Sequence, residues 1–172
     1  MQDNDKGKIS VSMMCVSIDL IMDYLKAFER NHIELLHIDI MDGAFVPNIT
    51  IGVDYVKQLR KLTNIPLDFH FMVEKPEEKM PWFDIRKGDW VSVHWESTNH
   101  IDKCLQYIRD IGARPVIALN PGTPISVIEE SYDYLDGVLL LSVNPGFAGQ
   151  KIIPSVIKKV QRLHEHLKEI GR

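Results

Sequence analysis

The chain has 172 residues, of which 45% are apolar and 26% charged, with a net charge of −4. This is the composition of one ordinary globular domain, and the lack of a basic, aromatic-rich patch argues against nucleic acid as a partner. No apolar run reaches the roughly 18 residues of a membrane span, so we expect no membrane partner. The polar N-terminal lead, residues 1–8, lacks the apolar core of a signal peptide. Because Cys15 and Cys104 are isolated, we expect free thiols and a cytoplasmic location.

Apolar periodicity predicts alternating strands and helices over residues 9–172, after a polar N-terminal lead at residues 1–8. The predicted strands are Ile9–Met14, Glu34–Met41, Ile65–Val73, Trp90–Trp95, Pro115–Leu119 and Gly137–Val143. The predicted helices are Leu20–Phe28, Asp54–Leu62, Pro76–Gly88, Ile101–Ile111, Thr123–Tyr132 and Pro154–Ile170. The alternation, at a spacing of about 28 residues, predicts a parallel sheet with right-handed crossovers. The sixth strand is nearly all apolar, which predicts that both its faces are covered.

The sheet can be an open doubly wound sheet or a closed barrel. A dinucleotide-binding fold would have glycines after the first strand, where the sequence reads Ser12–Cys15. Polar side chains instead lie near the C-terminal ends of four predicted strands: Ser12, His37, Asp39, His70, His94 and Glu96. Such convergence favours the mouth of a TIM-type (β/α)8 barrel. Because eight units need roughly 220 residues, we expect about six of them here, in a single incomplete barrel domain at residues 9–172.

The segment His37–Gly43 carries an imidazole and a carboxylate on one face of a predicted buried strand. A buried carboxylate is costly unless it is compensated. Together with His70 on the next strand, His37 and Asp39 can hold a divalent transition metal with positions left open. The alternative is that each is a buried polar residue with satisfied hydrogen bonds. His94 and Glu96 form a weaker group, for which a structural role and a catalytic role both stay open.

Two further features lie at the predicted mouth. Met14, Met41 and Met72 fall on the inward faces, where methionine serves either core packing or an apolar site lining. The loop Asn144–Gln150 is rich in glycine and carries Phe147. A lid or an anion-binding turn fits this loop better than a plain strand-to-helix turn.

Four motifs together resemble the ribulose-phosphate 3-epimerase family, over the chain from Ile9 to its end. They are His37–Gly43 with Phe45–Asn48, Asp68–Val73, Leu119–Pro124 and Val143–Lys151. The resemblance implies a TIM barrel and a divalent metal ion, Zn, Fe, Mn or Co, held by His37, Asp39 and His70. It also implies a sugar phosphate as substrate.

The resemblance further implies a role for each site residue. Asp39 is one acid/base in the inversion of C3 that converts ribulose 5-phosphate to xylulose 5-phosphate through a cis-enediolate. The implied substrate-binding residues are Ser12, His70, Met41, Met72 and the closing loop of Gly146, Phe147, Ala148 and Gly149. Two short signatures, Ser12–Cys15 and Phe147–Gln150, are similar to the allulose-6-phosphate 3-epimerase branch. Epimerisation of allulose 6-phosphate to fructose 6-phosphate therefore stays as the alternative.

The sequence departs from the family pattern in three ways. Ala44 stands where the family usually has His, and Leu141 where it usually has Met. The chain also stops at Arg172, where the family continues with a second acid/base aspartate and two phosphate-binding turns. We therefore expect this chain alone to be inactive or impaired, and its unpaired sheet edges to favour a homo-oligomer.

Two other functions stay open from the sequence. A metal-dependent hydrolase is disfavoured, because the chain lacks a second carboxylate to activate a water molecule. The alternative of another class is a non-catalytic barrel fragment.

Overall fold

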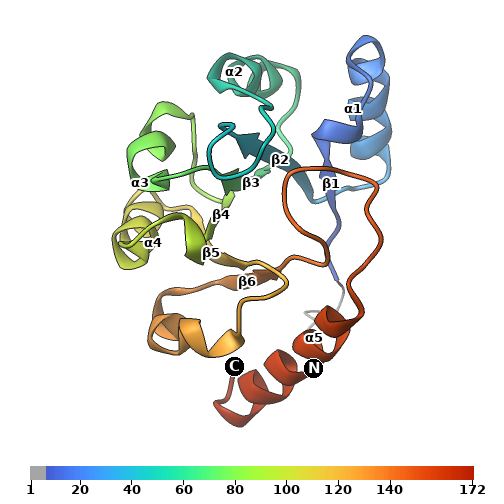
Figure 1. Cartoon of the computed structure of the whole chain (residues 1–172). Helices are drawn as coiled ribbons and strands as arrows, with labels where there is room; N and C mark the ends of the chain where they lie inside the picture. Colours follow the sequence, from blue (N-terminus) through green and yellow to red (C-terminus); the bar gives the residue numbers. More distant parts are fainter. Residues whose placement is uncertain (1–6) are drawn as a thin grey trace.

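A computed structural model describes residues 7–172, and most of the predicted polar lead lies outside the described residues. Six strands form one sheet, ordered β1-β2-β3-β4-β5-β6, in which all neighbours are parallel. They are β1 (Ser10–Ser12), β2 (Leu35–Met41), β3 (Leu67–Met72), β4 (Trp90–His94), β5 (Arg114–Leu119) and β6 (Gly137–Leu140). The sheet curls into an arc with helices on its outer side (Figure 1). The predicted incomplete TIM-type barrel of about six units is confirmed.

Helices and short 3-10 segments connect the strands. The helices are α1 (Ile21–Arg30), α2 (Val53–Leu62), α3 (Pro76–Lys79), α4 (Ile101–Asp110) and α5 (Pro154–Glu169). The 3-10 segments are η1 (Met13–Cys15), η2 (Ile18–Leu20), η3 (Met80–Trp82), η4 (Trp95–Ser97) and η5 (Ile125–Tyr134). Pro76 and Pro154 stand in the first turns of α3 and α5, where the missing N–H has no helical partner to lose.

The register of the sheet aligns the polar side chains at its inner face. Ser12 of β1 pairs with His37 of β2, Asp39 pairs with His70 of β3, and Met41 pairs with Met72. Because parallel strands in register keep the same face at each level, these side chains converge near the C-terminal ends of β1, β2 and β3.

The main apolar core lies on the other face of the sheet, under the helices. Leu36, Ile38, Phe69 and Phe71 of β2 and β3 are fully or almost fully buried there. From the helices come residues at helical spacing, such as Cys104, Leu105 and Ile108 of α4. Each large side chain buried in this way contributes about 1.5–3 kcal/mol. The inner face is thereby free to carry polar groups.

A buried carboxylate at the opposite end of the sheet ties β3 to its neighbours. Asp89 is 2% exposed and accepts the backbone N–H groups of Leu67, at 2.9 Å, and Arg86, at 2.7 Å. The guanidinium of Arg60, on α2, pairs with the same carboxylate. These donors compensate the burial of the charge and hold the start of the strand that carries His70.

Four predicted boundaries are wrong. β1 ends at Ser12, and Met13–Cys15 forms a 3-10 turn, because pairing with β2 stops at His37. The helix predicted at Pro76–Gly88 ends at Lys79, with a 3-10 turn at Met80–Trp82, because Pro81 lacks a helical N–H.

The other two wrong predictions lie in the C-terminal part of the chain, in the segment predicted as a helix at Thr123–Tyr132 and in β6. The segment Ile125–Tyr134 is a 3-10 segment, which fits the β-branched residues at its start. β6 ends at Leu140, and the predicted coverage of both its faces is wrong, because all four of its residues are only partly buried. β5 is its one neighbour in the described sheet.

Over the described residues, no helix combines the length and the apolar character that crossing a membrane requires.

Candidate metal centre and active site

Three ligand-type side chains meet at the C-terminal ends of β2 and β3. His37 Nε2 and His70 Nδ1 each lie 3.2 Å from Asp39 Oδ1. In His37, Asp39 and His70, one potential ligand atom from each lies within 4.8 Å of the others. Two imidazole nitrogens and one carboxylate are a donor set suited to a divalent transition metal. The predicted convergence of these three residues is therefore present in the fold.

Asp39 is held as an anion by its neighbours. It is 8% exposed, and Ser12 donates a hydrogen bond from Oγ to its Oδ2 at 2.9 Å. Burial by itself would raise the pKa of Asp39, but hydrogen bonds from His37 and His70 hold that pKa far below its usual range. Oδ1 of Asp39 thus faces the two imidazoles, while Ser12 orients Oδ2.

His37 lies between two carboxylates. Its Nδ1 is 2.7 Å from Asp68 Oδ2, and Ser10 donates a hydrogen bond to the same oxygen at 2.7 Å. Burial would lower the pKa of His37, but the hydrogen bonds with Asp39 and Asp68 raise it to about 10. The hydrogen bond between Nδ1 and Asp68 fixes the orientation of the His37 ring. Metal-binding histidines commonly have such a carboxylate partner on the nitrogen that does not bind the metal.

His70 has a different surrounding, because it is almost fully buried. Burial lowers its pKa to about 4, against the opposing hydrogen bond with Asp39. Its Nε2 lies 2.9 Å from Nε2 of His94, on β4. His70 is therefore neutral at physiological pH and ready to act as a ligand.

A pocket of about 390 Å³ opens over these residues, within the usual size range for a small-molecule site. Of the predicted substrate-binding residues, Ser12, His70, Met41, Met72, Gly146, Phe147 and Ala148 line it. Gly149 is not among its lining residues, because it lies further along the loop, in an exposed position. Met41 and Met72 pack with Val46 in a small apolar cluster beside the pocket, and both also line the pocket.

The loop Asn144–Gln150 lies against the segment that follows β2. Asn48 donates a hydrogen bond from Nδ2 to the carbonyl oxygen of Gly146 at 2.7 Å. Gly146 has a φ of +118°, and a Cβ at this position would lie 3.3 Å from Cβ of Val46. Phe147 is 53% exposed at the rim of the pocket. The loop thus closes one side of the site and presents an aromatic ring to the solvent.

Sequence reasoning missed two acidic residues that organise the site. Asp68 precedes His70 by two positions and is in register with His37, a signal that period-2 alternation already contains. Asp42 accepts hydrogen bonds from Nζ of Lys79, at 2.6 Å, and from the backbone N–H groups of Ala44 and Phe45, at 2.9 and 3.1 Å. Burial opposes ionisation, but these donors lower the pKa of Asp42 to about 2. Asp42 thereby shapes the turn after β2.

The fold and the site together indicate the class of protein to which the chain belongs. A curled (β/α) barrel with two imidazoles and a carboxylate at the C-terminal ends of its strands is the framework of a metal-dependent barrel enzyme. The family model described as "Ribulose-phosphate 3 epimerase family" matches residues 8–172. The chain belongs to this family of epimerases.

Individual relatives agree with this assignment. The chain is 41% identical to the ribulose-phosphate 3-epimerase of Bacillus subtilis, covering 96% of this chain and 76% of the relative. It is 44% identical to that of Aquifex aeolicus, over 84% of this chain and 65% of the relative. It is 43% identical to the chloroplastic ribulose-5-phosphate-3-epimerase of Arabidopsis thaliana, over 95% of this chain and 59% of the relative.

Proposed function

We propose that this chain binds one divalent metal ion through His37, Asp39 and His70 and acts on C3 of ribulose 5-phosphate, in the direction of xylulose 5-phosphate. The observation that carries the proposal is the convergence of the two imidazoles on Asp39 Oδ1 at the barrel mouth. The substrate is that of the related ribulose-phosphate and ribulose-5-phosphate 3-epimerases. Zn, Fe, Mn and Co all suit a site of two nitrogens and one oxygen.

Several residues of the chain contribute to the removal of the proton from C3. A bound divalent metal supplies positive charge that stabilises the negative charge developing on the substrate oxygens. Asp39 is ionised and accepts the proton from C3, while Ser12 holds its Oδ2 in place. A positioned acid/base of this kind contributes on the order of 10²–10⁴ in rate. His37 and His70 lie on the other side of the carboxylate, at its Oδ1.

The apolar residues around Asp39 protect the reacting carbon from water. Met41, Met72 and Val46 are almost fully buried beside the polar group. The loop with Phe147 lies over the open side, held by Asn48. Exclusion of water from a site strengthens the electrostatic contribution of its charged groups.

The proposal extends to the cellular location and the oligomeric state of the protein. We propose a cytoplasmic enzyme, which is supported by the free thiols of Cys15 and Cys104. We also propose a homo-oligomer, for which the exposed sheet edges argue.

Metal content and proton exchange test the proposal together. The purified chain is loaded with Zn²⁺, Mn²⁺ or Co²⁺, desalted and assayed for bound metal, and then incubated with ribulose 5-phosphate in D2O. We expect one metal ion per chain and deuterium at C3 by NMR. Within residues 7–172, Asp39 is the one carboxylate of the metal group. Exchange should therefore exceed epimerisation, since Asp39 serves one face of C3.

Asp39→Asn should lose both metal and exchange. Asp54→Asn is the matched control, because Asp54 lies on α2 with a side chain that is 95% exposed, and it should behave as wild type. A wild-type chain that binds no metal, or an Asp39→Asn variant that retains metal and exchange, would contradict the proposal. Epimerisation as fast as exchange would contradict the single-face role of Asp39.

A further inference from the structure

His94 and Glu96 lie behind the metal centre and have no part in the mechanism described so far. His94 is completely buried, with Nε2 at 2.9 Å from Nε2 of His70 and Nδ1 at 3.2 Å from Oε2 of Glu96. The ring of His94 stacks on that of His70, with centroids 5.0 Å apart. Phe45 packs against His94, with centroids 4.8 Å apart. The imidazole therefore has one fixed orientation.

Glu96 is itself anchored. Its Oε1 accepts the backbone N–H of Asn120 at 2.9 Å and the hydroxyl of Thr123. Lys159 of α5, which is 4% exposed, donates a hydrogen bond to the carbonyl oxygen of Asn120 at 2.8 Å. Oε2 of Glu96 is left for His94.

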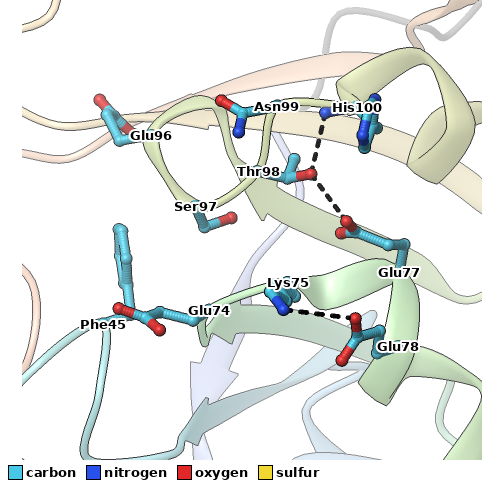
Figure 2. A pocket seen from close by; sticks show the side chains of 10 residues that line it. All are labelled: Phe45, Glu74, Lys75, Glu77, Glu78, Glu96, Ser97, Thr98, Asn99 and His100. Atoms are coloured by element: carbon cyan, nitrogen blue, oxygen red, sulfur yellow. Dashed lines mark hydrogen bonds and ion pairs between the residues drawn. The ribbon is translucent and has the colours of Figure 1, made fainter.

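Glu96 also lines a neighbouring pocket, together with other charged residues. Figure 2 shows Glu96 and Phe45 at one end of that pocket, away from Thr98, Glu77 and the Lys75–Glu78 ion pair. Thr98 bonds Glu77 at 3.1 Å, and Lys75 lies 3.7 Å from Glu78. Glu96 connects this pocket to His94 through its Oε2, at 3.2 Å from Nδ1.

A count of protons shows what the row Asp39, His70, His94 and Glu96 can do. Three contacts join the four side chains, at 3.2, 2.9 and 3.2 Å. The carboxylates are acceptors only, and each neutral imidazole carries one ring proton. With both imidazoles neutral, the row holds two protons for three contacts, so in one contact two acceptors face each other. A cation stabilises such a contact.

The position of the third ligand decides which contact lacks the proton. His37 Nε2 converges on the same Asp39 oxygen as His70 Nδ1, so a cation belongs at the Asp39 end of the row. With the cation bound there, His94 donates its Nδ1 proton to Glu96 and accepts the Nε2 proton of His70. We propose that His94 and Glu96 are positioning residues that hold His70 as the Nε2–H tautomer and so keep its Nδ1 free to bind the metal.

This inference rests on the proposed metal centre, and its test measures metal binding instead of turnover. Zinc affinity is determined by competition titration for wild type, His94→Phe, His94→Gln and Glu96→Gln. Loss of a partner behind a metal-binding histidine costs about 10–100-fold in affinity, and we expect a loss of this size for His94→Phe. His94→Gln should lose less, because its amide oxygen can accept the same proton. Glu96→Gln should fall between wild type and His94→Phe.

A second readout observes the tautomer directly. Long-range ¹H–¹⁵N NMR of the zinc-loaded wild-type chain should show a proton on Nε2 of His70 and on Nδ1 of His94. His100→Gln, an exposed histidine variant from the segment after η4, should leave both the affinity and the spectrum of His70 unchanged. The NMR result on wild type also decides the matter if His94→Phe fails to fold.

The outcomes separate this inference from the proposal on which it rests. A wild-type chain that binds no zinc would overturn the metal centre and the tautomer assignment with it. Normal zinc binding by wild type, with unchanged affinity in folded His94→Phe and Glu96→Gln, would overturn the positioning role alone. Zinc on Nε2 of His70 would do the same.

Discussion

At the residue scale, the two imidazoles of the metal centre differ in the number of protons that they carry before the metal arrives. His37 lies between Asp39 and Asp68, whose hydrogen bonds raise its pKa to about 10 against the effect of burial. Burial lowers the pKa of His70 to about 4. At neutral pH the metal-free site therefore holds one imidazolium, one neutral imidazole and one carboxylate. Only His37 has a proton that the metal must displace.

Metal uptake should accordingly release one proton per ion near pH 8. Zinc affinity should weaken by about tenfold for each unit by which the pH falls below 10, as expected for the displacement of a single proton. Calorimetric titrations in buffers of different ionisation enthalpy count the proton. Asp68→Asn keeps an acceptor for His37 Nδ1 but removes a charge, so it should reduce the proton release at pH 8. Uptake without proton release would contradict this picture of His37.

The same pKa predicts how the stability of the metal-free chain changes with pH. The pKa of His37 rises from 6.5 in the unfolded chain to about 10 in the folded one. A raised pKa stabilises the fold below the unfolded value, and this contribution is lost as the pH rises through the folded value. Urea unfolding of the metal-free chain should show a loss of stability between about pH 6.5 and 10. Asp68→Asn should make that loss smaller.

At the scale of elements, the site depends on a contact between two loops. Asn48 follows β2, Gly146 follows β6, and the hydrogen bond between them joins positions 98 residues apart. Gly146 and Gly149 both have positive φ, at +118° and +76°, but only at Gly146 would a Cβ also meet a neighbour, Val46. A substitution at Gly149 therefore tests backbone strain alone, whereas one at Gly146 tests backbone strain together with close packing.

Substituting these glycines should detach the loop to different degrees. A residue with a Cβ in the left-handed region costs about 1–2 kcal/mol, which corresponds to a roughly 5–30-fold larger open population. Chymotrypsin cleavage after the exposed Phe147 reports that population. We expect the cleavage rate to rise in the order Gly122→Ala, Gly149→Ala, Gly146→Ala. Gly122 is the control, because its φ is ordinary and a Cβ there meets nothing. Equal rates for the two loop variants would show that contact with Val46 does not matter.

The elements also show how far the sequence alone reaches. Period-2 alternation places His37 and Asp39 on one face, and adjacent strands in register bring His70 beside them, so the metal group was predictable. The extent of β1 and β6 was not, because an edge strand ends where its single partner stops pairing. The Asn48–Gly146 contact depends on a tertiary distance, which no local pattern contains.

At the scale of the whole molecule, the described barrel has two open edges. β1 and β6 each pair with one neighbour in the described sheet, and they stand at the two ends of the arc of strands in Figure 1. α5 adds apolar surface, since Ile157 and Val160 are 52% and 51% exposed on consecutive turns. Unpaired parallel edges and exposed aliphatic side chains both favour association.

We therefore predict that the chain self-associates at micromolar concentration and that α5 contributes to the contact. Ile157→Lys combined with Val160→Lys should weaken association by at least about tenfold, because buried ammonium groups without partners are costly in an interface. Leu62→Lys, on α2, is the matched control, since Leu62 is 41% exposed. Sedimentation velocity over a concentration series measures the effect. A wild-type chain that stays monomeric throughout would contradict the role of the open edges, whereas association unchanged in the double variant would exclude α5 and leave β1 and β6 as the contact.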